Sequence, residues 1–267
     1  MMDSASLPLL FSLTKHQRVL RAMTRLELQK KYAGSLLGYT WIVLQPLLFL
    51  GAYLLVFLVI FRVRLPGMTD LGYVAYVFSG LIPFLTLIEV ATTAPVVIRQ
   101  NMHLIKNVIV PIEIIPLRVV AGALVVQLVG LTLLLLILGL DLEFGWKLLF
   151  LPAVILLSAL FLVGLALLLA PIGVIVPDIG HGIGIAMNLL MFVSPIAFQI
   201  DMVPRLVRFM VYLNPATYLV EAYRSALLPA YPLNPLRLAI FVALSVILFV
   251  VGCRIMQRFK STIVDYE

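Results

Sequence analysis

Charge is scarce in this sequence, and cysteine is almost absent. Only 12% of the 267 residues are Asp, Glu, Lys or Arg, and the single cysteine, Cys253, lies in the last apolar segment. Soluble domains carry about twice that share of charge, so these residues could not cover a water-facing surface and the outer face must meet lipid. One cysteine cannot form an intramolecular disulfide, and we expect it to serve packing.

The sequence also lacks the motifs of the common enzyme classes. It contains no G-x-x-x-x-G-K-[ST] phosphate loop, so we expect that the chain does not hydrolyse ATP itself. Neither G-x-S-x-G nor H-E-x-x-H occurs, and the histidines, His16, His103 and His181, are widely separated. We therefore predict no catalytic residue, no metal site and no cofactor in this chain.

Long apolar stretches are abundant. Apolar residues make up 63% of the chain, and its mean hydropathy is +1.16. A membrane-spanning helix needs about 20 such residues. We predict an all-α integral membrane protein with six transmembrane helices, a single domain over residues 1–267 with a short basic tail at 257–267. The predicted spans are about 39–61, 73–98, 112–140, 148–172, 182–198 and 236–256.

The segment 13–33 is basic and amphipathic. It carries too many charges to span, and its basic residues recur at helical spacing opposite an apolar stripe. The basic residues are Lys15, Arg18, Arg21 and Arg25, and the stripe is Val19, Met23 and Leu26. We predict an interfacial helix in the cytoplasmic headgroup plane, broken by Gly34 and Gly38 before the first span.

The stretch 199–234 is too polar to span, yet it contains two short apolar helical patterns at about 204–213 and 216–228. Prolines interrupt it repeatedly. We predict re-entrant or interfacial helices before the last span, which need protein or a water-filled cavity around their broken backbone. Aromatic residues near this outer side form either an interfacial belt or a stacking surface for sugar rings. They include Phe192, Phe198, Phe209, Tyr212, Tyr218 and Tyr223.

Glu89 is the most informative charge within a predicted span. An ionisable group in a membrane helix is costly, so it usually faces a cavity or a partner. Glu89 either lines a transport path or is a hydrogen-bonded structural residue. Glu113 and Arg118 lie near the end of a span, and we expect them to snorkel to the interface.

The distribution of Lys and Arg predicts that both ends of the chain are cytoplasmic. These residues are densest in 13–33, 99–106 and 254–260, which lie on one side of a six-span arrangement. The net charge of +7 is then a topological signal that also attracts anionic headgroups. We therefore expect membrane lipids, and no nucleic acid, as its partners.

Three stretches resemble the ABC-2 type permeases, in particular the branch that exports O-antigen, capsule or teichoic-acid polysaccharides. They are "KKYAGSLLGYTWIVLQPLL" (30–48), "SPIAFQIDMVP" (194–204) and "LNPATYLVEAYRSALL" (213–228). Their order covers nearly the whole chain. The resemblance implies a homodimer in the bacterial inner membrane, with two separate ATPase subunits that bind ATP and Mg.

The resemblance also implies roles for particular residues. The segment between the second and third spans would couple to the ATPase through Gln100, Asn101, Met102, His103, Leu104, Ile105, Lys106 and Asn107. The cytoplasmic gate, which meets the substrate headgroup, would contain Arg25, Lys30, Lys31, Gly38 and Trp41. Glu89 and the outer aromatic residues would line the channel or its exit.

The expected function is export of an undecaprenyl-linked, O-antigen-like polysaccharide. The alternatives are an ABC-2 exporter of a drug or another lipid, a multi-span enzyme acting on glycolipid, and an ATP-independent channel. The enzyme would need clustered Asp, His or Arg at one membrane face, and the histidines do not cluster. The channel leaves the helix at 13–33 and the polar segment at 100–107 without a purpose.

Overall fold

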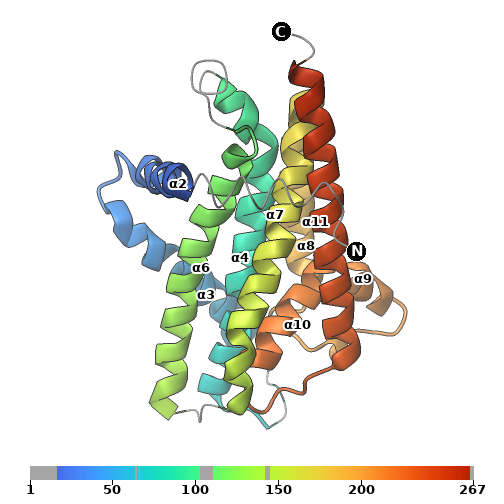
Figure 1. The fold of residues 1–267 in the computed structure, drawn as a ribbon. Coiled ribbons are helices and arrows are strands. Elements are labelled where there is room, and N and C mark those ends of the chain that lie inside the picture. The colour runs from blue at the N-terminus through green and yellow to red at the C-terminus, as the bar shows by residue number, and fades with distance from the viewer. Residues whose placement is uncertain (1–16, 64, 66, 103–110, 142–144, 265–267) are drawn as a thin grey trace.

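The computed structural model describes residues 17–63, 65, 67–102, 111–141 and 145–264, and within these ranges it contains helices and no strands (Figure 1). The longer helices are α2 (Gln17–Tyr32), α3 (Trp41–Leu54), α4 (Asp70–Gln100), α6 (Ile114–Asp141), α7 (Leu151–Ile175), α8 (Ile179–Val193), α10 (Pro215–Leu227) and α11 (Pro235–Val264). The short ones are η1 (Gly38–Thr40), η2 (Leu55–Ile60, a π-helix), η3 (Trp146–Phe150), η4 (Ile200–Met202) and α9 (Arg208–Leu213).

Five helical stretches of the described chain are long and apolar enough to cross a membrane, which confirms an integral membrane protein. They are Gly38–Ile60, Asp70–Gln100, Ile114–Gly139, Trp146–Ile175 and Pro235–Lys260. The span predicted at 182–198 is instead the 15-residue helix α8, about 22 Å long and shorter than the roughly 30 Å apolar core of a bilayer. The helix stops at Val193 because Ser194 adopts an extended backbone before Pro195. Six full spans are therefore not confirmed.

Helix α2 is the amphipathic helix expected at the N-terminal side, although residues 13–16 of that prediction lie outside the described residues. In Figure 1 it is seen nearly end-on beside the bundle, whose long helices run up the page. The break after α2 falls where the sequence predicted it, because Gly34 and Gly38 take the positive φ values +77° and +49° that favour glycine.

Helix α4 forms the centre of the bundle. It contacts α6, α7, α8 and α10. Of the residues in its most apolar stretch 67% are buried, whereas only 11% are buried in that of the first span. Small residues allow its neighbours to approach closely: a Cβ on Gly173 of α7 would overlap the carbonyl oxygen of Pro95 of α4. Helices α7 and α11 meet in the same way at Gly164 and Gly252.

Helix α10 lies inside the protein, although its sequence is not long enough to span. All its residues from Ala216 to Leu227 except Tyr218 are buried, and it contacts α4, α7 and α11. Its N-terminus is capped by Asn214, whose side-chain oxygen accepts a hydrogen bond from the Ala216 amide. The two helices predicted before the last span are thus present as α9 and α10; their re-entrant placement stays a prediction.

Candidate functional site

A polar cavity lies between α2, α4 and α6. Its volume is about 460 Å³. Its lining includes charged side chains from all three helices, together with Gln100 and Asn101 at the end of α4. The charged residues are Glu27, Lys30, Lys31, Glu89 and Arg118. We call this the inner cavity.

Two ion pairs connect α2 to the bundle across the inner cavity. Lys31 Nζ lies 2.9 Å from Glu89 Oε1, and Arg118 Nε lies 3.3 Å from Glu27 Oε2. The signs are crossed: α2 supplies an acid and then, one turn later, a base, while the bundle supplies their counterparts. Next to the Lys31–Glu89 pair, burial raises the pKa of the Tyr32 phenol, so the Tyr32 side chain stays neutral.

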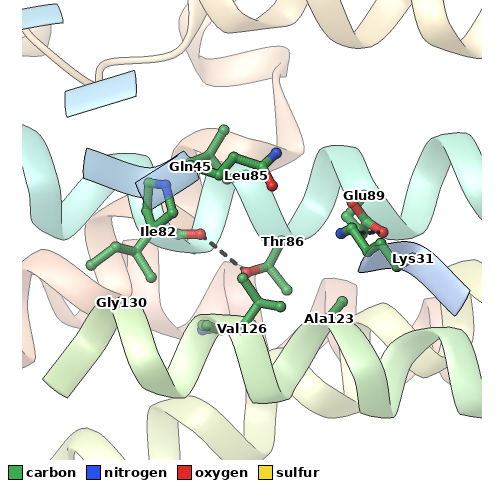
Figure 2. Close-up of a pocket in the computed structure, with 11 residues that line it drawn as sticks. Lys31, Gln45, Ile82, Leu85, Thr86, Glu89, Ala123, Val126 and Gly130 are labelled. Carbon is green, nitrogen blue, oxygen red and sulfur yellow. Dashed lines mark hydrogen bonds and ion pairs between the residues drawn. The ribbon is translucent and has the colours of Figure 1, made fainter. Parts of the chain in front are cut away.

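A smaller pocket of about 40 Å³ continues from the inner cavity towards the middle of the bundle (Figure 2). It shares Lys31 and Glu89 with the inner cavity and is otherwise mostly apolar, with Gln45, Thr86 and Gln127 as further polar residues. A volume of this size has room for a water molecule. Gln127 Oε1 is buried and has no hydrogen-bond partner among the described residues.

Exchanging the charges of the Lys31–Glu89 pair tests whether it holds α2. Both side chains are about one-third exposed, 30% and 33%, so we expect a modest coupling energy of about 0.5–1 kcal/mol. Lys31→Glu and Glu89→Lys should each speed amide hydrogen exchange in α2, and the double variant should recover most of the protection. The same exchange at Lys260–Glu113, an ion pair between α11 and the residue just before α6, is the control and should leave α2 unchanged. Additive effects at Lys31 and Glu89 would contradict the pairing.

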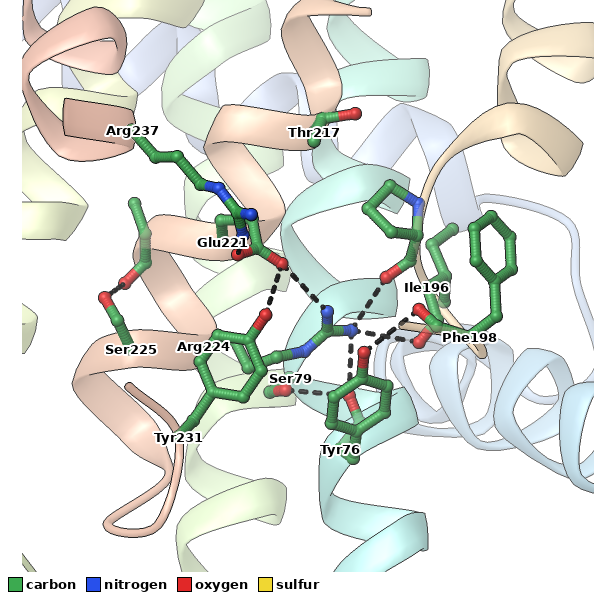
Figure 3. A network of polar contacts seen from close by, with 12 residues as sticks. Tyr76, Ser79, Ile196, Phe198, Thr217, Glu221, Arg224, Ser225, Tyr231 and Arg237 are labelled. Atoms are coloured by element: carbon green, nitrogen blue, oxygen red, sulfur yellow. Dashed lines mark hydrogen bonds and ion pairs between the residues drawn. The ribbon is translucent and has the colours of Figure 1, made fainter. Parts of the chain in front are cut away.

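A second polar site surrounds Arg224 of α10, and we call it the outer network (Figure 3). Arg224 is fully buried. Its guanidinium carbon lies 3.6 Å from the centre of the Tyr76 ring and 5.5 Å from that of Tyr231. Its Nη2 donates hydrogen bonds to the carbonyl oxygens of Pro195 at 2.9 Å and Ile196 at 3.0 Å.

These contacts explain how an irregular backbone is tolerated deep in the protein. Buried carbonyl groups need partners, and residues 194–197, which follow α8, are buried without belonging to a helix. Arg224 satisfies the carbonyls of 195 and 196, and Tyr73 and Tyr76 donate to those of Ala197 and Phe198. Side chains of α4 and α10 thus replace the hydrogen bonds that a continued α8 would have made.

Glu221 joins the outer network to α11. Its Oε2 accepts a hydrogen bond from Arg237 at 2.6 Å, and its Oε1 accepts one from the Tyr231 hydroxyl at 2.7 Å. Oε1 also lies 3.4 Å from Arg224. Burial and the neighbouring Glu221 carboxylate raise the pKa of Tyr231, which keeps this phenol a hydrogen-bond donor.

The structure brings together some of the residues predicted from the sequence. Lys30, Lys31 and Glu89 meet at the inner cavity, Arg25 is exposed on α2, and the Trp41 indole donates to Ser35. Of the predicted coupling residues, only the first three lie in the described chain, and Gln100 and Asn101 line the inner cavity. Residues 103–107 lie outside the described residues.

The predicted outer aromatic residues do not form one surface within the chain. Phe192, Phe209 and Tyr212 are exposed. Tyr218 donates to the carbonyl of Tyr212. Tyr223 is fully buried, contacts Gln127 and Ser158, and presents no ring to a passing sugar in this arrangement.

Snorkelling of Arg118 is a wrong prediction. The side chain is only 4% exposed because α2 covers the end of α6 that carries it. Glu113 is also buried and pairs with Lys260 at 2.9 Å. Sequence reasoning missed Glu221 and Arg224 as well, although an Arg three residues after a Glu in an otherwise apolar helical pattern was a usable signal.

Within the described residues, no three His, Cys, Asp or Glu side chains are grouped in a way that could hold a metal ion. Most charged side chains of the two polar sites instead form ion pairs, and Arg224 also bonds to the backbone. The two sites are therefore suited to binding and to holding helices.

Comparison with known proteins gives consistent matches along the chain. The ABC-2 type transporter family matches residues 18–228. An O-antigen export system permease protein of Klebsiella pneumoniae is 24% identical over 91% of this chain and 92% of its own length. One from Myxococcus xanthus is 26% identical over 80% and 81%. A polysialic acid transport protein of Escherichia coli is 28% identical over 77% and 79%.

Proposed function

The chain belongs to the ABC-2 type transporter family, and from this premise we propose that it is the permease subunit of a polysaccharide exporter. The substrate is a lipid-linked, O-antigen-like glycan that moves from the cytoplasmic to the outer side of the bacterial inner membrane. The observation that carries the proposal is the match over about nine-tenths of the chain to O-antigen export permeases. The relatives reported above favour polysaccharide export over a drug exporter or a glycolipid enzyme.

Energy for export comes, in this proposal, from two copies of a separate ATPase that binds ATP and Mg. The chain has no phosphate loop of its own. Gln100–Asn107 docks on the ATPase, and its first two residues line the inner cavity beneath α2. Nucleotide-dependent movement at this segment therefore reaches α2 directly, and Arg25, Lys30 and Lys31 on α2 form the cytoplasmic gate, with both chain ends on the cytoplasmic side.

Two copies of the chain enclose the glycan path. A hydrophilic polymer cannot cross bare lipid, and α8 has no buried residue within the chain. Asn188 lies on the exposed part of this apolar helix. A polar amide facing lipid is unfavourable, so the Asn188 side chain is better placed against a neighbouring copy of the chain or along a polar path.

Co-purification tests the proposal. The tagged chain, expressed with its neighbouring genes and extracted in mild detergent, should bring an ATPase subunit with it in equal amount. Alanine substitutions across Gln100–Asn107 should release most of that ATPase, because the docking contacts are lost. Alanine substitution of Met202, Arg205 and Leu206, which are exposed residues before α9, is the control and should leave it bound. A chain that purifies alone, in cells that still display the polysaccharide, would contradict the proposed coupling.

A further inference from the structure

The inner cavity is roomy where it meets α6 because small residues line it there. Gly122 and Ala123 of α6 and Thr93 of α4 contribute to the lining. A Cβ on Gly122 would still be 4.0 Å from its nearest neighbour, Leu28. The volume of about 460 Å³ is in the range of small-molecule sites, and it exceeds what one or two waters need.

Arg118 reaches this cavity as a buried cation with unused hydrogen-bonding capacity. A guanidinium has five N–H donors, and the residue is 3% exposed. Its Nε is within ion-pair distance of Glu27, yet that N–H does not point at the carboxylate and has no hydrogen-bond partner among the described residues. A buried donor without a partner is costly, so an acceptor on a ligand that entered the cavity would be favoured at this N–H.

The charges around the cavity are unequal. Three basic residues, Lys30, Lys31 and Arg118, face two carboxylates, Glu27 and Glu89. These five are the charged residues among the described residues that line the cavity, so one positive charge is left over there. The surplus attracts an anion, and low-dielectric walls strengthen that attraction.

We propose that the inner cavity binds the phosphate groups of an anionic lipid headgroup through Arg118, Lys30 and Lys31. The bound phosphate replaces the carboxylates of Glu27 and Glu89 as the partner of Arg118 and Lys31. Phosphate oxygens fit the planar fork of an arginine. The two carboxylates come from different helices, so their release from Arg118 and Lys31 frees α2 from the bundle. The identity of the lipid as the carrier of the exported glycan rests on the proposed function; the phosphate site itself does not.

The position of the cavity agrees with a lipid ligand. Arg118 lies in the first two turns of a candidate span, and α2 lies beside the bundle at that level (Figure 1). Phosphates of membrane lipids occupy the same interfacial level. Gln100 and Asn101 also line the cavity, so an occupied site borders the segment proposed to dock on the ATPase.

Lipid binding to the full chain tests this inference. The chain is placed in phosphatidylcholine nanodiscs with increasing amounts of undecaprenyl pyrophosphate, and the bound lipid is counted by native mass spectrometry. We expect Arg118→Met to weaken binding at least tenfold and Arg118→Lys to weaken it less. Arg21→Met, at an exposed arginine of α2 outside the cavity, is the matched control and should change binding less than twofold.

Glu89→Gln is the decisive variant, because the proposal predicts that it strengthens lipid binding. It removes a competing carboxylate, so binding should become severalfold tighter, whereas a variant that merely damages the fold would bind less. Equal binding by wild type, Arg118→Met and Glu89→Gln would overturn the proposal. The proposed function would still stand if cells export the polysaccharide and the chain co-purifies with an ATPase.

Two further probes identify the source of the phosphate. Competition by inorganic pyrophosphate would support recognition of the headgroup itself. Equally tight binding of phosphatidylglycerol would support the anion site and assign it to bulk anionic lipid. Binding that depends on the lipid tail and is insensitive to Arg118 would overturn the assignment.

Discussion

Replacing Arg224 with leucine is expected to abolish export and to prevent most of the protein from folding. The carbonyl oxygens of Pro195 and Ile196 lose a buried donor, whereas that of Tyr76 still accepts from Ser79. Each unsatisfied group costs about 1–3 kcal/mol. Glu221 loses one of its two basic partners as well. We expect a loss of at least about 3 kcal/mol in the free energy of unfolding, measured as a lower midpoint of thermal aggregation in detergent and as absence of polysaccharide from the cell surface.

The matched control for Arg224 is Arg205→Leu, which removes an exposed arginine shortly before α9. It should leave both the aggregation midpoint and the surface polysaccharide unchanged. Arg224→Lys should fall between the two, because an ammonium group keeps the charge but cannot reproduce the geometry of a guanidinium. Equal stability of Arg224→Leu and Arg205→Leu would show that the carbonyls of 195 and 196 find other partners.

Gly173→Ala is expected to be strongly destabilising although it adds one methyl group. The new Cβ would overlap the carbonyl oxygen of Pro95, which belongs to the backbone of α4 and cannot rotate away. Helices α4 and α7 must therefore separate, and we expect a loss of roughly 2–3 kcal/mol or more. The yield of monodisperse protein in gel filtration and its aggregation midpoint would measure this loss.

The same substitution at Gly182 of α8 is the control for steric overlap. Nothing lies within 4 Å of a Cβ at that position in the chain. Since alanine is the better helix former by up to about 1 kcal/mol, Gly182→Ala should be neutral or slightly stabilising. If Gly173→Ala were as well tolerated as Gly182→Ala, the close α4–α7 contact would be wrong.

Prediction from the sequence was most successful where one helix at a time decides the answer. The amphipathic helix α2 and its break at Gly34 and Gly38 were predicted, as were five membrane-length helices. Each depends on the composition of one continuous stretch of sequence. A run of about 20 apolar residues is enough to favour a membrane span, and glycine readily takes positive φ. The functional branch was also recognisable, from the order of three motifs.

Prediction failed where the partner of a residue comes from elsewhere in the chain. Arg118 was expected to snorkel freely into the headgroup layer, but α2, some 90 residues earlier, covers its side chain. Glu89 could not be assigned to Lys31, nor Arg224 to the carbonyls of 195 and 196. The end of α8 has a local cause, because the extended Ser194 precedes Pro195. That the irregular backbone after it could be buried depended on Tyr73, Tyr76 and Arg224, which satisfy its carbonyl groups.

The sequence by itself determined that this is a multi-pass membrane protein with an amphipathic helix before its first span, since hydropathy and helix periodicity are local properties of the chain. Only the tertiary structure decided which charges are buried, how they pair and where a cavity remains. The physical reason is that a charge in an apolar protein must find its counterpart in space, and neighbours in space are set by how helices pack and not by their separation along the chain.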